Sequence, residues 1–183
     1  MVLVLIAGGT MLAYARWTRP ITQADAELAA GQLAPALAGY ATAETRFDRM
    51  PPLKQAFSSE YDRVVANQLL LLYRLGRYDE TIDKAEHAPE GAIPHFWAGL
   101  ALYRKGEIER KPDARLQLVN GAQQELYRAL EASPEDWDTK YNFELVTRLQ
   151  NSLHPRPKAA QEKTFLIRPE QSKKPGQPAK PGG

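Results

Sequence analysis

Cysteine is absent from this chain of 183 residues, and histidine occurs only three times. Without cysteine the chain has no disulfide scaffold, no zinc ribbon and no thiol-based active site. His87, His95 and His154 lie far apart, and none has a second histidine four residues on, so the H-E-x-x-H zinc motif is missing. The lack of cysteine does not indicate a compartment, because exported proteins also do without disulfides.

A strong excess of charge of one sign is also missing. The 24 lysine and arginine residues against 22 aspartate and glutamate residues give a net charge of +2, which argues against a dedicated nucleic-acid binder. The balance hides a split along the chain. Residues 154–183 hold seven basic and two acidic side chains, which leaves 17 basic and 20 acidic side chains in residues 1–153. The body is therefore mildly acidic and the C-terminal segment is basic.

Strand signals are scarce in residues 20–150, where alternating β-branched residues are missing and Ala, Leu, Glu, Gln and Arg dominate. Apolar residues instead recur three and four positions apart, which predicts helices. Gly31, Gly76 and Gly106 each end one such run and precede the next. Because a left-handed glycine ends a helix without a steric penalty, we expect tight turns between antiparallel helices at all three. The pattern predicts an all-α fold.

The helices belong to a loose internal repeat. Residues 75–80 read LGRYDE and residues 129–134 read ALEASP, which resemble the turn and the repeat end of tetratricopeptide repeats. The resemblance covers roughly residues 20–150 and implies a short α-solenoid of about three antiparallel helix pairs. It departs from the family pattern in an insertion after Gly106. We expect Pro112 to open a long helix there, since its fixed φ and missing N–H suit a first helical turn.

An apolar segment precedes the repeats. Residues 2–15 read VLVLIAGGTMLAYA without a charged side chain, and Arg16 and Arg19 follow. At 1.5 Å per residue these 14 residues cover about 21 Å of a bilayer core of about 30 Å. Snorkelling of the arginines, with Trp17 at the interface, would extend the span. We therefore predict that residues 1–19 are an N-terminal membrane helix, with a cleaved signal peptide or a buried soluble helix as alternatives.

The chain also resembles a second, narrower family. A short chain with an apolar N-terminus and few degenerate repeats, ending in WDTKYNFELV at residues 137–146, is similar to the MxaK-like accessory proteins. These are encoded beside MoxR-type ATPases and von Willebrand factor A proteins, and in some bacteria beside methanol dehydrogenase. The resemblance implies a role in maturing periplasmic enzymes, from an inner-membrane anchor with a periplasmic body. Arg16 and Arg19 point to the cytoplasmic side instead, by the positive-inside rule.

The C-terminal segment, residues 154–183, contains six prolines and three glycines and little that could form a core. This composition predicts a basic, disordered tail rich in polyproline II. Within it residues 164–169 read TFLIRP, an apolar island in a polar sequence. The island either folds back onto the body or serves as a docking motif for a partner.

No constellation of residues indicates catalysis. His95 follows a proline and is expected at a helix start. Glu107 and Glu109 form a carboxylate pair beside a predicted turn, which needs no acid–base role to explain it. We therefore expect no enzymatic activity, no cofactor and no metal. A helical hydrolase would need a clustered acid–base site, which the sequence does not provide.

What remains is a surface for protein partners. In stacked helical hairpins the first helices line the concave side, and the tetratricopeptide pattern places arginine and aromatic residues from three helices there. Such residues are enriched in interface cores. Alternatively, the arginines near helix ends only oppose the helix dipole. The predicted protein-binding residues are Arg63, Tyr73, Arg74, Phe96, Tyr103, Arg104, Tyr141, Asn142 and Arg148.

These features together predict three parts: a membrane anchor at residues 1–19, a repeat domain at residues 20–153 and a tail at residues 154–183. We expect a non-catalytic, membrane-anchored scaffold for assembly or maturation of a complex. The second resemblance implies a MoxR-type ATPase and von Willebrand factor A system as partner, without nucleic acid. The alternative is a soluble cytoplasmic adaptor that binds an acidic peptide segment.

Overall fold

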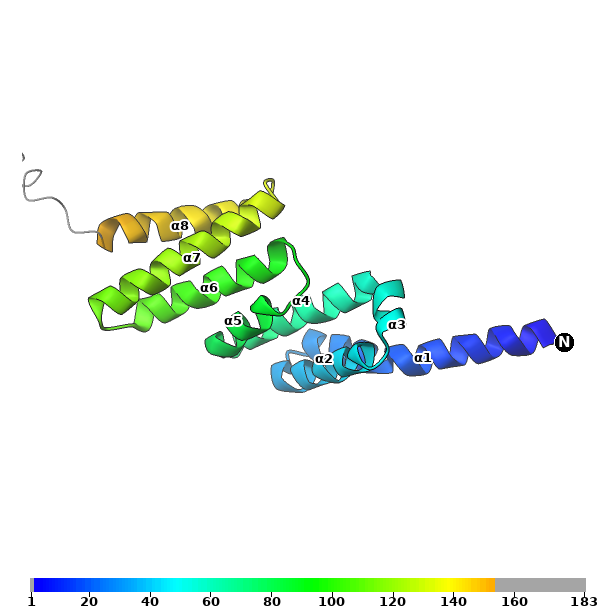
Figure 1. The fold of residues 1–183 in the computed structure, drawn as a ribbon. Coiled ribbons are helices and arrows are strands. Elements are labelled where there is room, and N and C mark those ends of the chain that lie inside the picture. Colours follow the sequence, from blue (N-terminus) through cyan, green and yellow to red (C-terminus); the bar gives the residue numbers. More distant parts are fainter. Residues whose placement is uncertain (1, 154–183) are drawn as a thin grey trace, which may run out of the picture.

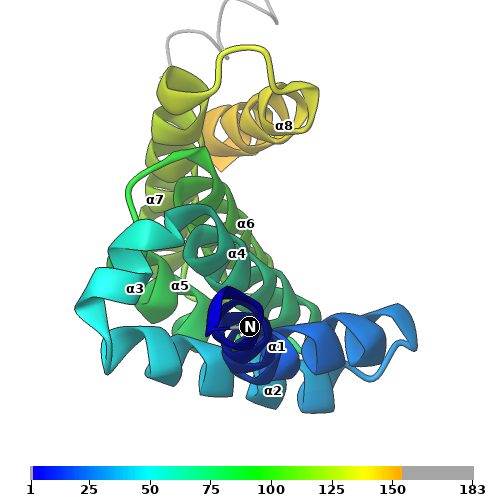
Figure 2. The ribbon, with the colours of Figure 1, turned by 90° about the vertical axis from the view of Figure 1, so that its right-hand side faces the viewer.

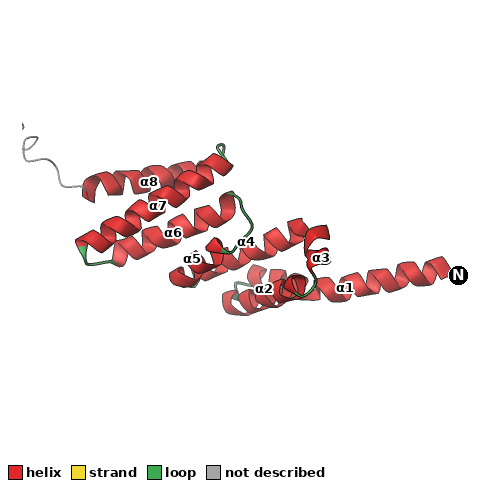
Figure 3. Ribbon diagram, viewed as in Figure 1, coloured by secondary structure: helices red, strands yellow, loops and turns green. Residues whose placement is uncertain are grey.

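The computed structural model describes the backbone of residues 2–153 and the side chains from residue 15 onward. The described residues form eight α-helices and no strand, which confirms the predicted all-α fold (Figures 1 and 3). The predicted tail and its apolar island lie outside the described residues. In chain order the helices are α1 (Val2–Ala29), α2 (Leu33–Asp48), α3 (Pro51–Ala56), α4 (Ser58–Arg74), α5 (Tyr78–Glu86), α6 (Ala92–Ile108), α7 (Pro112–Ala132) and α8 (Trp137–Leu153).

The helices pack in sequential pairs that follow one another along an elongated body. α1 pairs with α2, α4 with α5 and α6 with α7, while the short α3 joins the first two pairs. α8 packs on α7 and has no following helix among the described residues. Figures 1 and 2 show α8 at the opposite end of the stack from α1 and α2. The pair α1 and α2 therefore forms one end of the described stack of helices, and α8 forms the other.

Two apolar clusters hold this stack together. The first joins α1, α2 and α4 and contains the fully buried side chains of Tyr40, Phe47 and Leu69. The second joins α6, α7 and α8 around Leu126 and Val146. Because apolar residues three and four positions apart share one helix face, the amphipathic pattern of the sequence supplies both clusters.

Gly31 and Gly76 end their helices as predicted. Their φ angles are +73° and +72°, in the left-handed region. After α4 the amide of Gly76 donates to the carbonyl of Tyr73 at 3.0 Å, and the amide of Arg77 donates to that of Leu72 at 2.9 Å. These two bonds form a Schellman motif, which satisfies carbonyls that the helix end would leave without a partner.

The predicted turn at Gly106 is wrong. Gly106 is buried within α6, and a Cβ atom at this position would lie only 3.1 Å from Cγ2 of Val119 in α7. The glycine therefore allows two helices to approach closely, and spacing alone does not distinguish this role from a turn. The chain turns a few residues later, and Pro112 opens the long helix α7 as predicted.

Alanine at Gly76 and at Gly121 is expected to change stability in opposite directions. Gly76→Ala should lower the free energy of unfolding by about 1–2 kcal/mol, because an L-residue is strained at positive φ. Gly121 lies inside α7 with its nearest neighbour at 3.4 Å, so Gly121→Ala should raise stability by about 0.5–1 kcal/mol. Urea denaturation measures both. Equal stability of Gly76→Ala and the unchanged protein would contradict the Schellman turn.

Helix α1 continues without a break across the predicted domain boundary at residue 19. Pro20 lies inside it and has no N–H to donate to the carbonyl of Arg16. Arg46 of α2 replaces that donor, with its Nη1 atom 3.2 Å from the Arg16 oxygen and 3.1 Å from the Trp17 oxygen. Trp17 in turn packs edge-on against Phe47, with ring centroids 5.9 Å apart. The second half of α1 is thus part of the folded body.

The first half of α1 projects away from the body (Figures 1 and 2). None of the described helices combines the length and the apolar character that crossing a membrane requires.

Candidate protein-binding surfaces

Several of the predicted binding residues meet where α4 packs beside α6. The ring of Tyr73 lies 5.2 Å from that of Trp97, which in turn lies 5.1 Å from that of Phe96. Nε of Arg104 donates a hydrogen bond of 3.1 Å to the hydroxyl of Tyr73. We call Tyr73, Phe96, Trp97 and Arg104 the α4–α6 cluster. Trp97, which the sequence pattern did not single out, is its central ring.

The cationic group of the α4–α6 cluster already has an anionic partner. Nη1 of Arg104 lies 2.8 Å from Oε2 of Glu107, one turn along α6. The hydrogen bonds to Tyr73 and to Glu107 raise the pKa of Arg104, so it stays charged at every accessible pH. Tyr103 also donates to Glu107, at 2.8 Å, and burial together with this bond raises the pKa of Tyr103. A ligand carboxylate at Arg104 would therefore compete with the negative charge of Glu107.

Arg63 connects helices of the body. Its Nη1 atom lies 2.9 Å and 3.1 Å from the two carboxylate oxygens of Asp25 in α1. The hydroxyl of Tyr40 in α2 donates to the same carboxylate. Burial, strengthened by the bond to Asp25, raises the pKa of Tyr40 to about 12. This group joins α1, α2 and α4, which gives Arg63 a structural role.

The remaining predicted residues belong to α4 and α8. Arg74 is exposed near the end of α4 and has no ion pair within the described part of the chain. Tyr141, Asn142 and Arg148 all belong to α8, at the end of the stack. Asn142 donates to the carbonyl of Asp138 in its own helix at 2.7 Å, and Arg148 pairs with Glu144. The nine predicted residues come from three helices, α4, α6 and α8, and their role as one binding surface stays a prediction.

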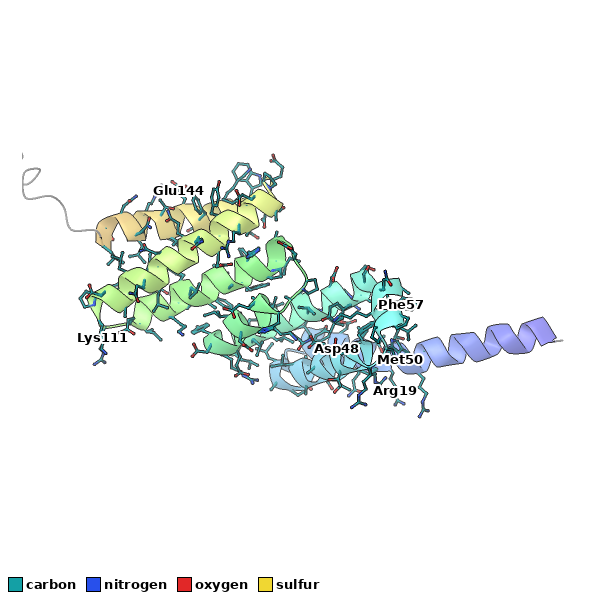
Figure 4. The ribbon with its side chains drawn as sticks, viewed as in Figure 1. Arg19, Asp48, Met50, Phe57, Lys111 and Glu144 are labelled. Carbon is teal, nitrogen blue, oxygen red and sulfur yellow. The ribbon has the colours of Figure 1, made fainter. Side chains whose placement is uncertain are left out.

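Tyr141, one of the predicted residues, belongs to an exposed stripe on the outer side of α8 whose other members, Trp137 and Leu145, are not among the nine predicted residues. Trp137 is 78% exposed, Tyr141 is 69% exposed and Leu145 is 37% exposed. Because these residues are four positions apart, they form one stripe along the helix. Thr139 and Val146 are buried on the opposite side of α8. We call Trp137, Tyr141 and Leu145 the α8 end face; Figure 4 shows the labelled Glu144 on the same outer side.

His95 links two helices. It lies in the first turn of α6, as predicted, and its Nδ1 atom is 2.7 Å from Oε2 of Glu125 in α7. Arg128 also contacts Glu125, at 2.9 Å. Within residues 2–153, no three histidine, aspartate or glutamate side chains gather closely enough to hold a metal ion.

The chain matches no protein-family model, and the search of curated proteins gives no match. The resemblances to tetratricopeptide repeats and to MxaK-like proteins therefore depend on the sequence motifs given above.

Proposed function

We propose that this protein is a non-catalytic, membrane-attached helical scaffold that binds a partner protein through the α8 end face. The observation that carries the proposal is the exposure of Trp137 and Tyr141 on the last described helix. Terminal helices of repeat arrays normally have a polar outer face, since an apolar one lowers solubility. Large aromatic side chains supply most hot spots of protein interfaces. An exposed aromatic stripe at this place therefore favours binding over structure alone.

The place of α8 in the stack indicates what kind of partner fits. Each of the three earlier pairs has a second helix packed on the first, whereas among the described helices α8 packs mainly on α7. From Trp137 to Leu145 the stripe extends about 12 Å along the helix axis, which matches the apolar stripe of one packed helix. We infer that the partner supplies an amphipathic helix in the place of a second helix, which the described residues do not provide for α8.

The identity of the partner and the location are supported by resemblance alone. Similarity to the MxaK-like proteins supports a MoxR-type ATPase and von Willebrand factor A system, with the body in the periplasm and α1 in the inner membrane. The rival function is a soluble cytoplasmic adaptor for an acidic peptide. The ion pairs of Arg63, Arg104 and Arg148 count against it, because each arginine already faces a carboxylate of this chain.

A photo-crosslinking amino acid at position 141 is expected to capture the partner in cells, because Tyr141 lies in the middle of the α8 end face. The matched control is the same group at Tyr127, an exposed tyrosine of α7. Trp137→Ala with Tyr141→Ala should weaken binding of the captured partner by about 30-fold or more. Helicity and melting temperature should change little, because both side chains are exposed.

Other results would reject this assignment. Position 141 could crosslink only to the C-terminal tail, or only to a second copy of the chain. In that case the tail or the second copy, and not a partner helix, occupies the α8 end face. If Arg74→Glu with Arg104→Glu abolishes binding while the α8 substitutions preserve it, the α4–α6 cluster is the binding surface and the acidic-peptide function is the better one.

A further inference from the structure

Four arginines gather where the projecting half of α1 leaves the body. Arg16 and Arg19 come from α1, and Arg46 and Arg49 come from the last turns and end of α2. We call these four residues the arginine collar. Arg16, Arg46 and Arg49 line one shallow pocket, together with Trp17 and Met50. Arg19 and Arg46 line a second pocket between α1 and α2, and Figure 4 shows Arg19 and Met50 near the root of the projecting segment.

The collar has positive charge that the described residues leave uncompensated. None of its arginines forms an ion pair with a described carboxylate, whereas many other cations of the body do, such as Arg63 and Arg128. Two carboxylates accompany these residues: Asp48 directly precedes Arg49 in the sequence, and Glu27 lines the second pocket with Arg19 and Arg46. Asp48 pairs with Lys54 at 3.0 Å, and Glu27 in the second pocket accepts a hydrogen bond from Gln23 at 3.0 Å. The collar is therefore a cationic patch on a mildly acidic body.

Arg46 is the fixed member of the collar. The missing N–H of Pro20 leaves the carbonyl of Arg16 open, and Arg46 Nη1 occupies that place. A guanidinium has five N–H donors, and no described side chain accepts a bond from the others. Rigid placement of an unpaired guanidinium suits recognition of a phosphate, which arginine binds through two parallel hydrogen bonds.

The apolar residues of the pocket indicate where the phosphate belongs. Trp17 packs on Phe47 inside the body yet also lines the pocket, and Met50 is 45% exposed at its rim. Residues 2–15 continue α1 outward without a charged side chain. Tryptophan and arginine next to an uncharged helical segment are typical of the headgroup level of a membrane.

We propose that the arginine collar binds the headgroup phosphates of anionic phospholipids at the membrane surface where α1 inserts. This inference rests on the proposed attachment of α1 to a membrane. It adds a lipid preference, and it assigns to Arg46 and Arg49, distant in sequence from the apolar segment, a part in holding the body against the bilayer.

The test uses Trp17 as the reporter. Trp97→Phe with Trp137→Phe leaves Trp17 as the single tryptophan of the full chain. The protein is reconstituted in equimolar phosphatidylcholine and phosphatidylglycerol vesicles, in which one lipid or the other carries brominated, quenching chains. Brominated phosphatidylglycerol should quench Trp17 more strongly. Arg16→Gln with Arg49→Gln should lower the preference for the anionic lipid at least about fivefold.

The matched control neutralises two other unpaired cations, Arg110 and Lys111, in the connection between α6 and α7. Figure 4 shows Lys111 far from the collar. Arg110→Gln with Lys111→Gln should preserve the lipid preference, and circular dichroism checks that all variants fold. If the variant with Trp17 as its single tryptophan does not fold, the protein with all three tryptophans is used. Native mass spectrometry of this protein from mixed nanodiscs then measures the same preference for anionic lipid.

Other outcomes contradict either the arginine collar or the proposed membrane attachment. Equal quenching by both brominated lipids, or a preference that the two double variants lower equally, overturns the collar as a site for anionic phospholipids. A preference unchanged by Arg16→Gln with Arg49→Gln overturns it as well. If neither lipid quenches Trp17, the proposed membrane attachment itself has failed.

Discussion

Gly99→Ala is expected to lower the free energy of unfolding by about 2 kcal/mol, because overpacking a closely fitted core costs about 1–3 kcal/mol. Gly99 is buried in α6, where a Cβ atom would lie 2.7 Å from Cγ of Leu126 and 3.2 Å from the carbonyl oxygen of Ala122. Leu126 is fully buried, so it has little room to yield. The helices α6 and α7 would have to separate. Urea denaturation with circular dichroism detection gives the change.

Gly121→Ala is the matched control for Gly99→Ala. It adds the same methyl group to α7, at ordinary contact distance from Leu102, and should stabilise the protein slightly. Gly99→Ala combined with Leu126→Ala should lower the free energy of unfolding by less than the sum of the two single changes, because the smaller side chain makes room for the added methyl group. If Gly99→Ala proves as stable as Gly121→Ala, the close approach of α6 and α7 is wrong.

Deletion of residues 2–14 is expected to release the protein almost completely from membranes. This deletion removes nearly all of the uncharged projecting half of α1 and preserves the folded body. Trp17 retains its contact with Phe47, and Ile21 and Ala24 stay buried in the first cluster. Carbonate extraction followed by immunoblotting should move the signal from the pellet to the supernatant, while the helical content per remaining residue stays high.

A longer deletion distinguishes the part of α1 that attaches the protein to the membrane from the part that stabilises the fold. Removing residues 1–17 also takes away Trp17, so its edge-on contact with the buried Phe47 is lost. We expect this variant to leave the membrane as well but to melt at a lower temperature, since such aromatic pairs contribute about 0.5–1.5 kcal/mol beyond burial. A variant lacking residues 2–14 that stays in the carbonate pellet would show that α1 is not the attachment.

The local elements of this fold could be predicted from the sequence because they depend on neighbouring residues. Helical spacing of apolar residues predicted the all-α fold, the Schellman turns need a glycine at positive φ, and Pro112 suits a first helical turn. Gly106 is the exception, and it shows where prediction from neighbouring residues fails. Its effect depends on Val119 across the helix interface, and nothing near Gly106 in the sequence distinguishes a close contact from a turn.

The candidate sites depended on the tertiary structure. The sequence placed arginines near helix ends, but only the packing showed that Arg63 faces Asp25, 38 residues away. It likewise brought Arg46 to the carbonyl that Pro20 leaves open in α1. Amphipathic spacing determines which residues share a helix face, whereas the neighbouring helix determines whether that face is covered. On α8 none of the described helices covers Trp137, and the sequence by itself did not determine that exposure.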